Sequence, residues 1–163
     1  MAYYFLFPEK DTTVYSHPDR ETLNTGHDEI LEILKEKGSS DAIYYPSRVL
    51  IQFKNSEIKS TISDVVSHTK FKSGSVALKL STVEHKNLAK VLNLELFAVS
   101  QSWEEGTGRF SNLPTSSNGT SWVYRDNDDA TKTKWTTGSF NTVYGSSGSL
   151  DAPGITEGGG VWY

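Results

Sequence analysis

Three short stretches of apolar residues limit the fold of this chain more than any other feature of its sequence. Residues 48–53 are rich in β-branched and aromatic side chains, as strands are. Residues 75–81 alternate apolar and polar side chains, and residues 92–99 alternate in the same way before they become continuously apolar. Because alternation with a period of two places one set of side chains in a core and the other in solvent, we predict strands at all three places.

Two further segments have helix-forming character. Residues 29–36 are good helix formers, yet Asn24-Thr25-Gly26 before them and Gly38-Ser39-Ser40 after them suit a hairpin equally well. Residues 56–66 carry apolar side chains at helical spacing, and Ser56 can cap that face. We predict a short helix or helical turn over 56–66. The residues themselves leave 29–36 open between helix and strand.

The length, composition and net charge of the chain exclude several classes of protein and site. A chain of 163 residues is long enough for one domain with a core of its own. The absence of cysteine excludes zinc–thiolate and iron–sulfur sites. With a formal charge of −4, the chain lacks the basic character of proteins that bind nucleic acids. No apolar run approaches the roughly 20 residues that are needed to cross a bilayer. We therefore expect no nucleic-acid partner and no membrane insertion.

The composition changes near residue 100. Ten of the 13 glycines follow Gln101, and aromatic residues recur among them. This pattern predicts long ordered loops held by aromatic rings, because disordered segments are poor in such residues. Trp122 and Trp135, flanked by polar residues, are candidates for stacking on a glycan. The alternative, in which these rings anchor the core or the loops, is the one we favour.

Carboxylates and histidines are the residues to consider for catalysis. Glu104 and Glu105 are adjacent, so on a strand they point to opposite faces and cannot form the facing pair of a glycosidase. Asp126, Asp128 or Asp129 can supply a partner only through folding. Nucleophile, phosphate-binding and metalloprotease motifs are absent from the sequence, and its four histidines are far apart. We predict no catalytic residue, no cofactor and a protein that is not an enzyme.

The sequence Asp126-Asn127-Asp128-Asp129 resembles the start of a calcium loop, because calcium prefers clustered carboxylate and amide oxygens. An EF-hand needs glycine and glutamate at the sixth and twelfth positions, where Thr131 and Thr137 stand. We keep Asp126, Asp128 and Asp129 as a weak candidate for an irregular calcium site and otherwise predict no metal. A solvated turn is the favoured alternative.

Several of these motifs, taken in order, resemble a DNRLRE-type module. The similar segments are Asp11 to Ser16, Asn24-Thr25-Gly26, Ser47 to Phe53, Ser75 to Ser81, Ser102-Trp103-Glu104-Glu105-Gly106-Thr107 and Gly119 to Gly138. The resemblance covers about residues 11–162, and the Trp-Glu-Glu-Gly segment is its most specific part.

The resemblance implies an all-β fold, an antiparallel jelly-roll-like β-sandwich with long ordered loops and one short helix. Such modules are related in shape to carbohydrate-binding modules. The long loops and the run from Ser146 to Tyr163 look more like the form found in virion proteins of tailed phages, especially T4-like phages of cyanobacteria. On this basis we interpret 29–36 as a strand. No functional residue is carried over, because the matched motifs look structural.

The expected organisation is an amino-terminal arm or first strand over 1–10 and a β-sandwich over 11–163, incomplete at its carboxyl end. Glycines 158–160 followed by Val161-Trp162-Tyr163 look like the beginning of a strand. An unclosed sandwich leaves edges that pair with other chains. Either the sequence is part of a longer protein, or a neighbouring subunit completes the sheet by strand addition.

We therefore expect a non-enzymatic structural component of a tailed-phage virion, located in the particle, in its capsid, neck, tail or baseplate. It would dock on other virion proteins in a multi-copy assembly. The predicted docking residues are aromatic or apolar and lie at both ends of the chain: Tyr3, Tyr4, Phe5, Phe7, Val161, Trp162 and Tyr163. The alternative is a carbohydrate-binding module for adhesion to a host or a polysaccharide.

Overall fold

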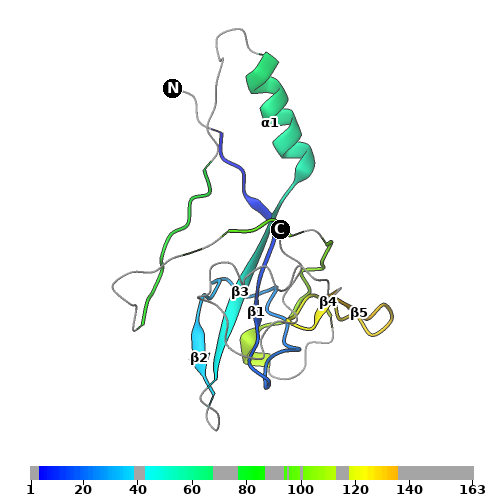
Figure 1. The fold of residues 1–163 in the computed structure, drawn as a ribbon. Coiled ribbons are helices and arrows are strands. Elements are labelled where there is room, and N and C mark those ends of the chain that lie inside the picture. The colour runs from blue at the N-terminus through cyan, green and yellow to red at the C-terminus, as the bar shows by residue number, and fades with distance from the viewer. Residues whose placement is uncertain are drawn as a thin grey trace. The chain divides into compact units, whose positions relative to one another are not determined.

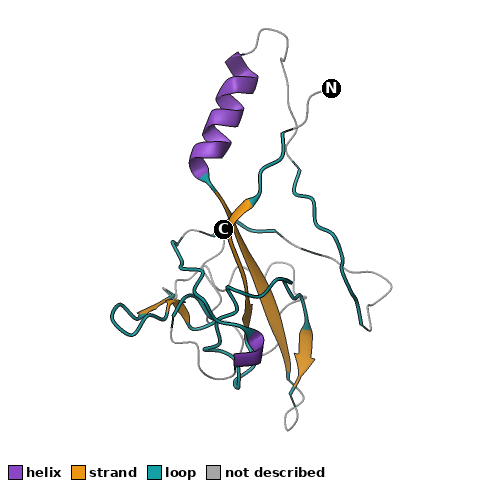
Figure 2. Ribbon diagram, turned by 180° about the vertical axis from the view of Figure 1, so that it is seen from behind, coloured by secondary structure: helices purple, strands orange, loops and turns teal. Residues whose placement is uncertain are grey.

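The computed structural model describes residues 4–38, 43–67, 77–86, 94, 96–99, 101–112 and 118–135. Within these ranges the elements are mostly strands joined by loops (Figures 1 and 2). They are β1 (Pro8–Tyr15), β2 (Lys35–Lys37), β3 (Tyr44–Phe53), α1 (Asn55–Ser67), the 3-10 turn η1 (Phe110–Asn112), β4 (Tyr124–Asp126) and β5 (Thr133–Lys134). The described residues therefore form an all-β fold with one short α-helix, as the sequence predicts.

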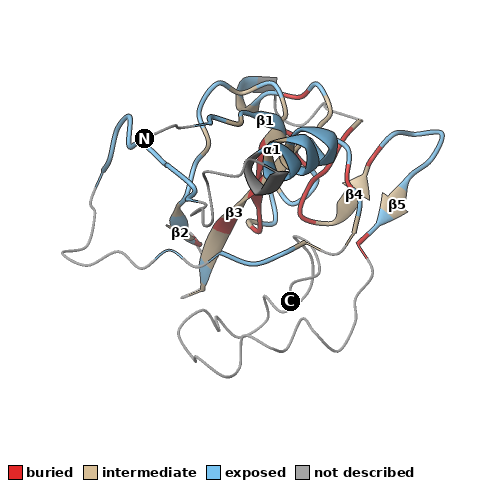
Figure 3. Ribbon diagram, turned by 90° about the horizontal axis from the view of Figure 1, so that it is seen from above, coloured by how far each residue is buried: buried red, intermediate tan, exposed pale blue. Residues whose placement is uncertain are grey.

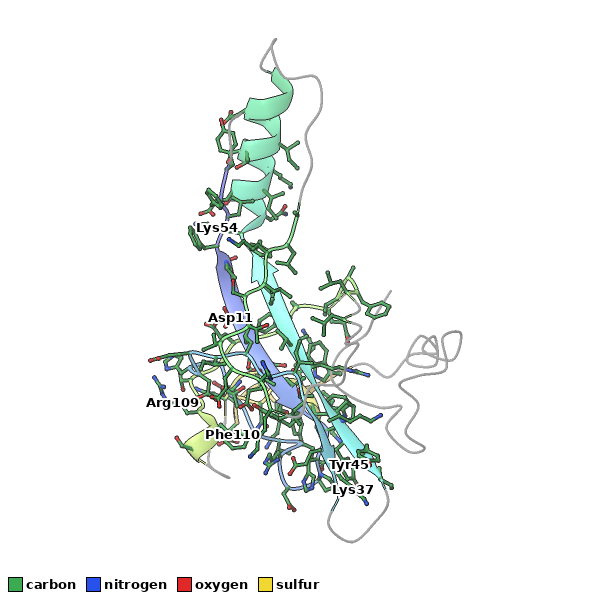
Figure 4. All side chains as sticks on the ribbon, turned by 90° about the vertical axis from the view of Figure 1, so that its left-hand side faces the viewer. Asp11, Lys37, Tyr45, Lys54, Arg109 and Phe110 are labelled. Atoms are coloured by element: carbon green, nitrogen blue, oxygen red, sulfur yellow. The ribbon has the colours of Figure 1, made fainter. Side chains whose placement is uncertain are left out.

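Strand β3 is the centre of a three-stranded sheet with the order β1-β3-β2 (Figure 1). β2 runs antiparallel to β3, with Lys35 opposite Pro46 and Lys37 opposite Tyr44; Figure 4 shows Lys37 and Tyr45 together at this end of the sheet. A second, two-stranded sheet pairs β4 with β5 in antiparallel order. The described strands thus form two small sheets.

The core is built around three indole rings. Trp103, Trp122 and Trp135 are each only 4% exposed, and they pack with Val14 from β1 and Leu50 from β3. Figure 3 shows this concentration of buried residues in β1 and β3 and in the loops beside β4. Burial of these three large aromatic side chains stabilises the loops that carry them, because it removes a large apolar surface from water.

The chain divides into two compact units. The first contains Met1–Glu9 and Ile51–Glu95, and the second contains Lys10–Leu50 and Leu96–Tyr163. Every buried residue of the core belongs to the second unit. The sequence did not indicate this division, because the pattern predicted one sandwich from residue 11 onward.

Two of the sequence-based elements are confirmed. The predicted strand at 48–53 lies within β3, which begins four residues earlier. The predicted helix at 56–66 is α1, although the role given to Ser56 was wrong. The backbone carbonyl of Lys54 accepts hydrogen bonds from the amides of Glu57 and Ile58, so the helix begins one residue before Ser56.

The segment 29–36 is neither a helix nor a full strand. Only Lys35–Lys37 form β2, and the residues before it are irregular. The side chain of Ser47 in β3 holds this segment, because its hydroxyl accepts from the amide of Leu34 and donates to the carbonyl of Glu32. Tertiary contacts with β3 therefore override the helix propensity of these residues.

The strands predicted at 75–81 and 92–99 are wrong for the residues that the structure describes there. Residues 77–81 belong to no strand and are exposed, and Leu96 and Phe97 are exposed loop residues. Only Val99 makes an isolated bridge. The other residues of both segments lie outside the described part.

In the described ranges, α1 is the only α-helix, and neither α1 nor η1 has the length and apolar character needed to cross a bilayer.

Candidate functional site

Asn24 joins three segments of the second unit. It is fully buried, and its side-chain amide nitrogen donates to the backbone carbonyls of Glu105, at 2.6 Å, and Thr120, at 2.8 Å. Its side-chain oxygen accepts from the amides of Gly26, at 3.2 Å, and Gly108, at 2.8 Å. All the hydrogen-bonding groups of the side chain are satisfied, so this residue has a structural role.

Two glycines make room for this junction. Gly106 and Gly119 have φ angles of +77° and +75°, a region that favours glycine. A Cβ on Gly119 would lie 2.3 Å from Gly106 Cα, and one on Gly106 would lie 2.5 Å from the Asn24 side-chain oxygen. Three of the segments that carry the family resemblance therefore meet here. No residue at the junction presents a free reactive group.

Glu104 and Glu105 contact neighbouring residues of β1. Glu104 pairs with Lys10 at 3.3 Å, and Glu105 Oε1 accepts from the amide of Asp11 at 2.9 Å. Burial, followed by the negative charge of Glu105, raises the pKa of Asp11 above its ordinary value. Asp11, which the sequence did not single out, is thus an acidic neighbour of Glu105.

Trp122 and Trp135 are unsuited to stacking on a glycan. Both rings are buried, the guanidinium of Arg48 lies 4.4 Å from the Trp122 ring centre, and Trp135 Nε1 donates to the carbonyl of Ser121 at 2.8 Å. A sugar needs an exposed ring face, which these residues do not offer. The burial of both rings fits the favoured alternative, in which they anchor the core and the loops.

The carboxylates at 126–129 form turns between β4 and β5. Asp126 accepts from the amide of Asp128 and the hydroxyl of Thr131, and Asp128 accepts from the amide of Ala130. Asp129 pairs with Lys132 at 3.8 Å. No group of three His, Cys, Asp or Glu side chains that could hold a metal occurs among the described residues. These hydrogen bonds are those of a turn rich in aspartate, the alternative favoured for this segment.

The aromatic residues of the amino-terminal arm are exposed. Tyr4, Phe5 and Phe7 are 63%, 75% and 77% exposed, and they precede β1 without belonging to it. Tyr3 and the carboxyl-terminal candidates Val161, Trp162 and Tyr163 lie outside the described residues. Exposed rings of this size are a common feature of surfaces that bind other proteins.

Many other described residues of the first unit are exposed as well. No residue of this unit whose exposure is described is buried, in contrast to the core of the second unit. Its exposed large apolar residues are Tyr4, Phe5, Phe7, Ile62, Leu78, Leu80, Val83 and Leu94. Figure 3 draws α1 in the colours of exposed and intermediate residues, and Figure 4 shows Lys54 at the start of that helix.

Comparison with known proteins found no matching family model, no similar curated protein and no similar solved structure.

Proposed function

We propose that this protein is a non-enzymatic structural component of a tailed-phage virion, and that it acts by docking on neighbouring subunits. The observation that supports the proposal is the contrast between its two units. The second unit buries Trp103, Trp122 and Trp135 in a core, whereas no residue of the first unit whose exposure is described is buried, and eight of its large apolar side chains are exposed. Apolar surface of this extent is stabilised by association with another protein.

The chemistry of the second unit supports a scaffolding role. Its buried polar side chain Asn24 is fully hydrogen-bonded within the chain, and the carboxylates Glu104 and Glu105 contact Lys10 and Asp11. These groups hold loops in place, and we assign none of them to catalysis. The proposal includes a jelly-roll-like sandwich, of which the three-stranded sheet is one part, and location in the particle.

Adhesion to a glycan is the less favoured function. The two rings that suggested it are buried in the core, so a glycan site would need other aromatic residues. No described residue favours that alternative, and we do not carry it further.

The proposal is tested by replacing the exposed rings of the arm in the assembled particle. Phe5→Ser with Phe7→Ser should lower incorporation into particles about tenfold or more, because exposed aromatic residues are the usual anchors of an interface. Deletion of residues 1–8 should abolish docking and leave the fold intact. The control, Ile30→Ser, changes an exposed apolar residue of the second unit and should incorporate normally. Normal incorporation of the arm variants would contradict the proposal.

A further inference from the structure

The sequence contains a single Asn-Gly pair, Asn118-Gly119, which lies in a loop of the second unit. Asparagine is one of the chemically labile residues of proteins. When glycine follows it, no side chain hinders the backbone nitrogen from attacking the asparagine carboxamide. Such pairs lose ammonia spontaneously in unfolded chains, so the surroundings of Asn118 decide whether the folded protein does the same.

The reaction at such a pair has two steps. The Gly119 nitrogen forms a bond to Asn118 Cγ and gives its proton to solvent, while the bond from Cγ to Nδ2 breaks and Nδ2 leaves as ammonia with a proton from solvent. Water then opens the cyclic imide. Cleavage at Cγ gives aspartate. Cleavage at the main-chain carbonyl carbon gives isoaspartate, in which the backbone runs through the side chain and is longer by a methylene group.

The carboxamide of Asn118 is held at both ends by Thr107. Its Oδ1 accepts from the backbone amide of Thr107 at 3.0 Å and from the Thr107 hydroxyl at 3.2 Å. Its Nδ2 donates to the same hydroxyl at 2.8 Å. Closure of the imide ring draws Cγ to the backbone and removes Nδ2, so the carboxamide has to leave Thr107 before it reacts.

Gly119 is held in place as well. Its φ is +75°, and a Cβ built on it would lie 2.3 Å from Gly106 Cα and 2.6 Å from Asn24 Nδ2. Its carbonyl accepts from the amide of Asn127 at 2.8 Å. The backbone on which the imide ring would form is therefore fixed by the Asn24 junction.

We infer that Asn118 is a deamidation site that the fold protects. The hydrogen bonds to Thr107 restrain the carboxamide, the close contact with Gly106 restrains Gly119, and the pair reacts when this part of the second unit opens. Local opening of a loop costs less free energy than unfolding of the whole unit, so the reaction reports on the junction itself.

The two products differ in how they fit the fold. Aspartate at 118 keeps the length of the backbone, and its carboxylate can accept from both the amide and the hydroxyl of Thr107. Isoaspartate lengthens the backbone directly beside Gly119, where even an added Cβ would meet Gly106. The junction therefore closes again around aspartate, whereas isoaspartate makes its opening irreversible.

The test measures the rate of deamidation at Asn118 by peptide mass spectrometry at neutral pH. The chain unfolded in urea should react about tenfold faster than the folded protein, or more. Thr107→Val keeps the shape and the backbone amide but removes the hydroxyl, so it should accelerate the reaction of the folded protein about threefold to tenfold. Thr133→Val, which removes a hydroxyl bonded to the carbonyl of Thr131 at an exposed site, is the matched control and should leave the rate unchanged.

Equal rates in the folded and unfolded protein would overturn the inference. So would a Thr107→Val variant that reacts no faster than Thr133→Val. The fluorescence of the buried tryptophans checks that both variants are folded.

A refolding experiment tests the difference between the products. Asn118→Asp should recover the tryptophan fluorescence of the folded protein after dilution from urea. The isoaspartate form, separated by chromatography after ageing in urea and identified by isoaspartyl methyltransferase labelling, should not recover it. Full recovery of the isoaspartate form would contradict the assignment of Gly119 to a site without room for a longer backbone.

Discussion

Asn24 connects segments that are more than 80 positions apart in sequence, and its four hydrogen bonds lie in a site without solvent. A buried amide in such a place stabilises only while all its partners are present, because an unpaired buried group retains its full desolvation cost. The motif Asn24-Thr25-Gly26 is visible in the sequence. Its partners are not, because a sequence of this kind carries no sign of which loop carbonyls will face the amide.

Replacement of Asn24 by alanine should lower the free energy of unfolding by about 3 kcal/mol, since the amide of Gly108 and the carbonyl of Thr120 lose their partners. Urea unfolding followed by tryptophan fluorescence measures the change. Asn118→Ala is the control, because the side chain of Asn118 bonds to Thr107 at an exposed site and its loss should cost less than about 1 kcal/mol. Equal effects of the two replacements would contradict the role given to Asn24.

Asp11 should make stability depend on pH. Because its pKa is raised in the fold, the folded protein holds the proton more tightly than the unfolded chain does. The free energy of unfolding should therefore fall as the pH rises from the ordinary value of 3.8 through the raised pKa. Asp11→Asn removes the carboxylate, and with it this loss of stability at higher pH. The variant should therefore be more stable than the unmodified protein at neutral pH and equally stable below pH 3.8.

At the scale of elements, β3 organises the second unit. It pairs with β1 and β2 and contributes Leu50 to the core. Its short apolar run and the helical spacing after it are strong local signals, which explains why β3 and α1 could be predicted. The segments at 75–81 and 92–99 have an equally clear alternation. Alternation shows which side chains share a face, but a strand also needs a partner strand, and among the described residues of these segments only Val99 forms so much as an isolated bridge.

Leu50→Ala should lower the free energy of unfolding by about 3 kcal/mol, because Leu50 is almost fully buried beside the tryptophans. Thermal unfolding followed by near-ultraviolet circular dichroism reports the change in the environment of the rings. Ile30→Ala, at an exposed apolar residue of the same unit, should stay within about 0.5 kcal/mol of the unmodified protein. A Leu50 variant as stable as the Ile30 variant would show that β3 does not carry the core.

At the scale of the molecule, the two units differ in what they bury. The second unit has tryptophans, a sheet and the Asn24 junction, whereas the described first unit is an exposed helix with exposed apolar segments. The sequence predicted aromatic rings as anchors of the loops, and the burial of Trp122 and Trp135 agrees with that interpretation. The two-unit division could not be predicted, because it depends on contacts between distant parts of the chain and not on local composition.

We propose that this protein acts by docking within a particle. Electron microscopy of particles purified from the source in which the protein occurs tests it most directly. The account predicts regular density for the chain in contact with several other subunits, with the exposed rings Tyr4, Phe5 and Phe7 buried against them. Absence of the chain from the particles, or density in which these rings remain in solvent, would contradict the account.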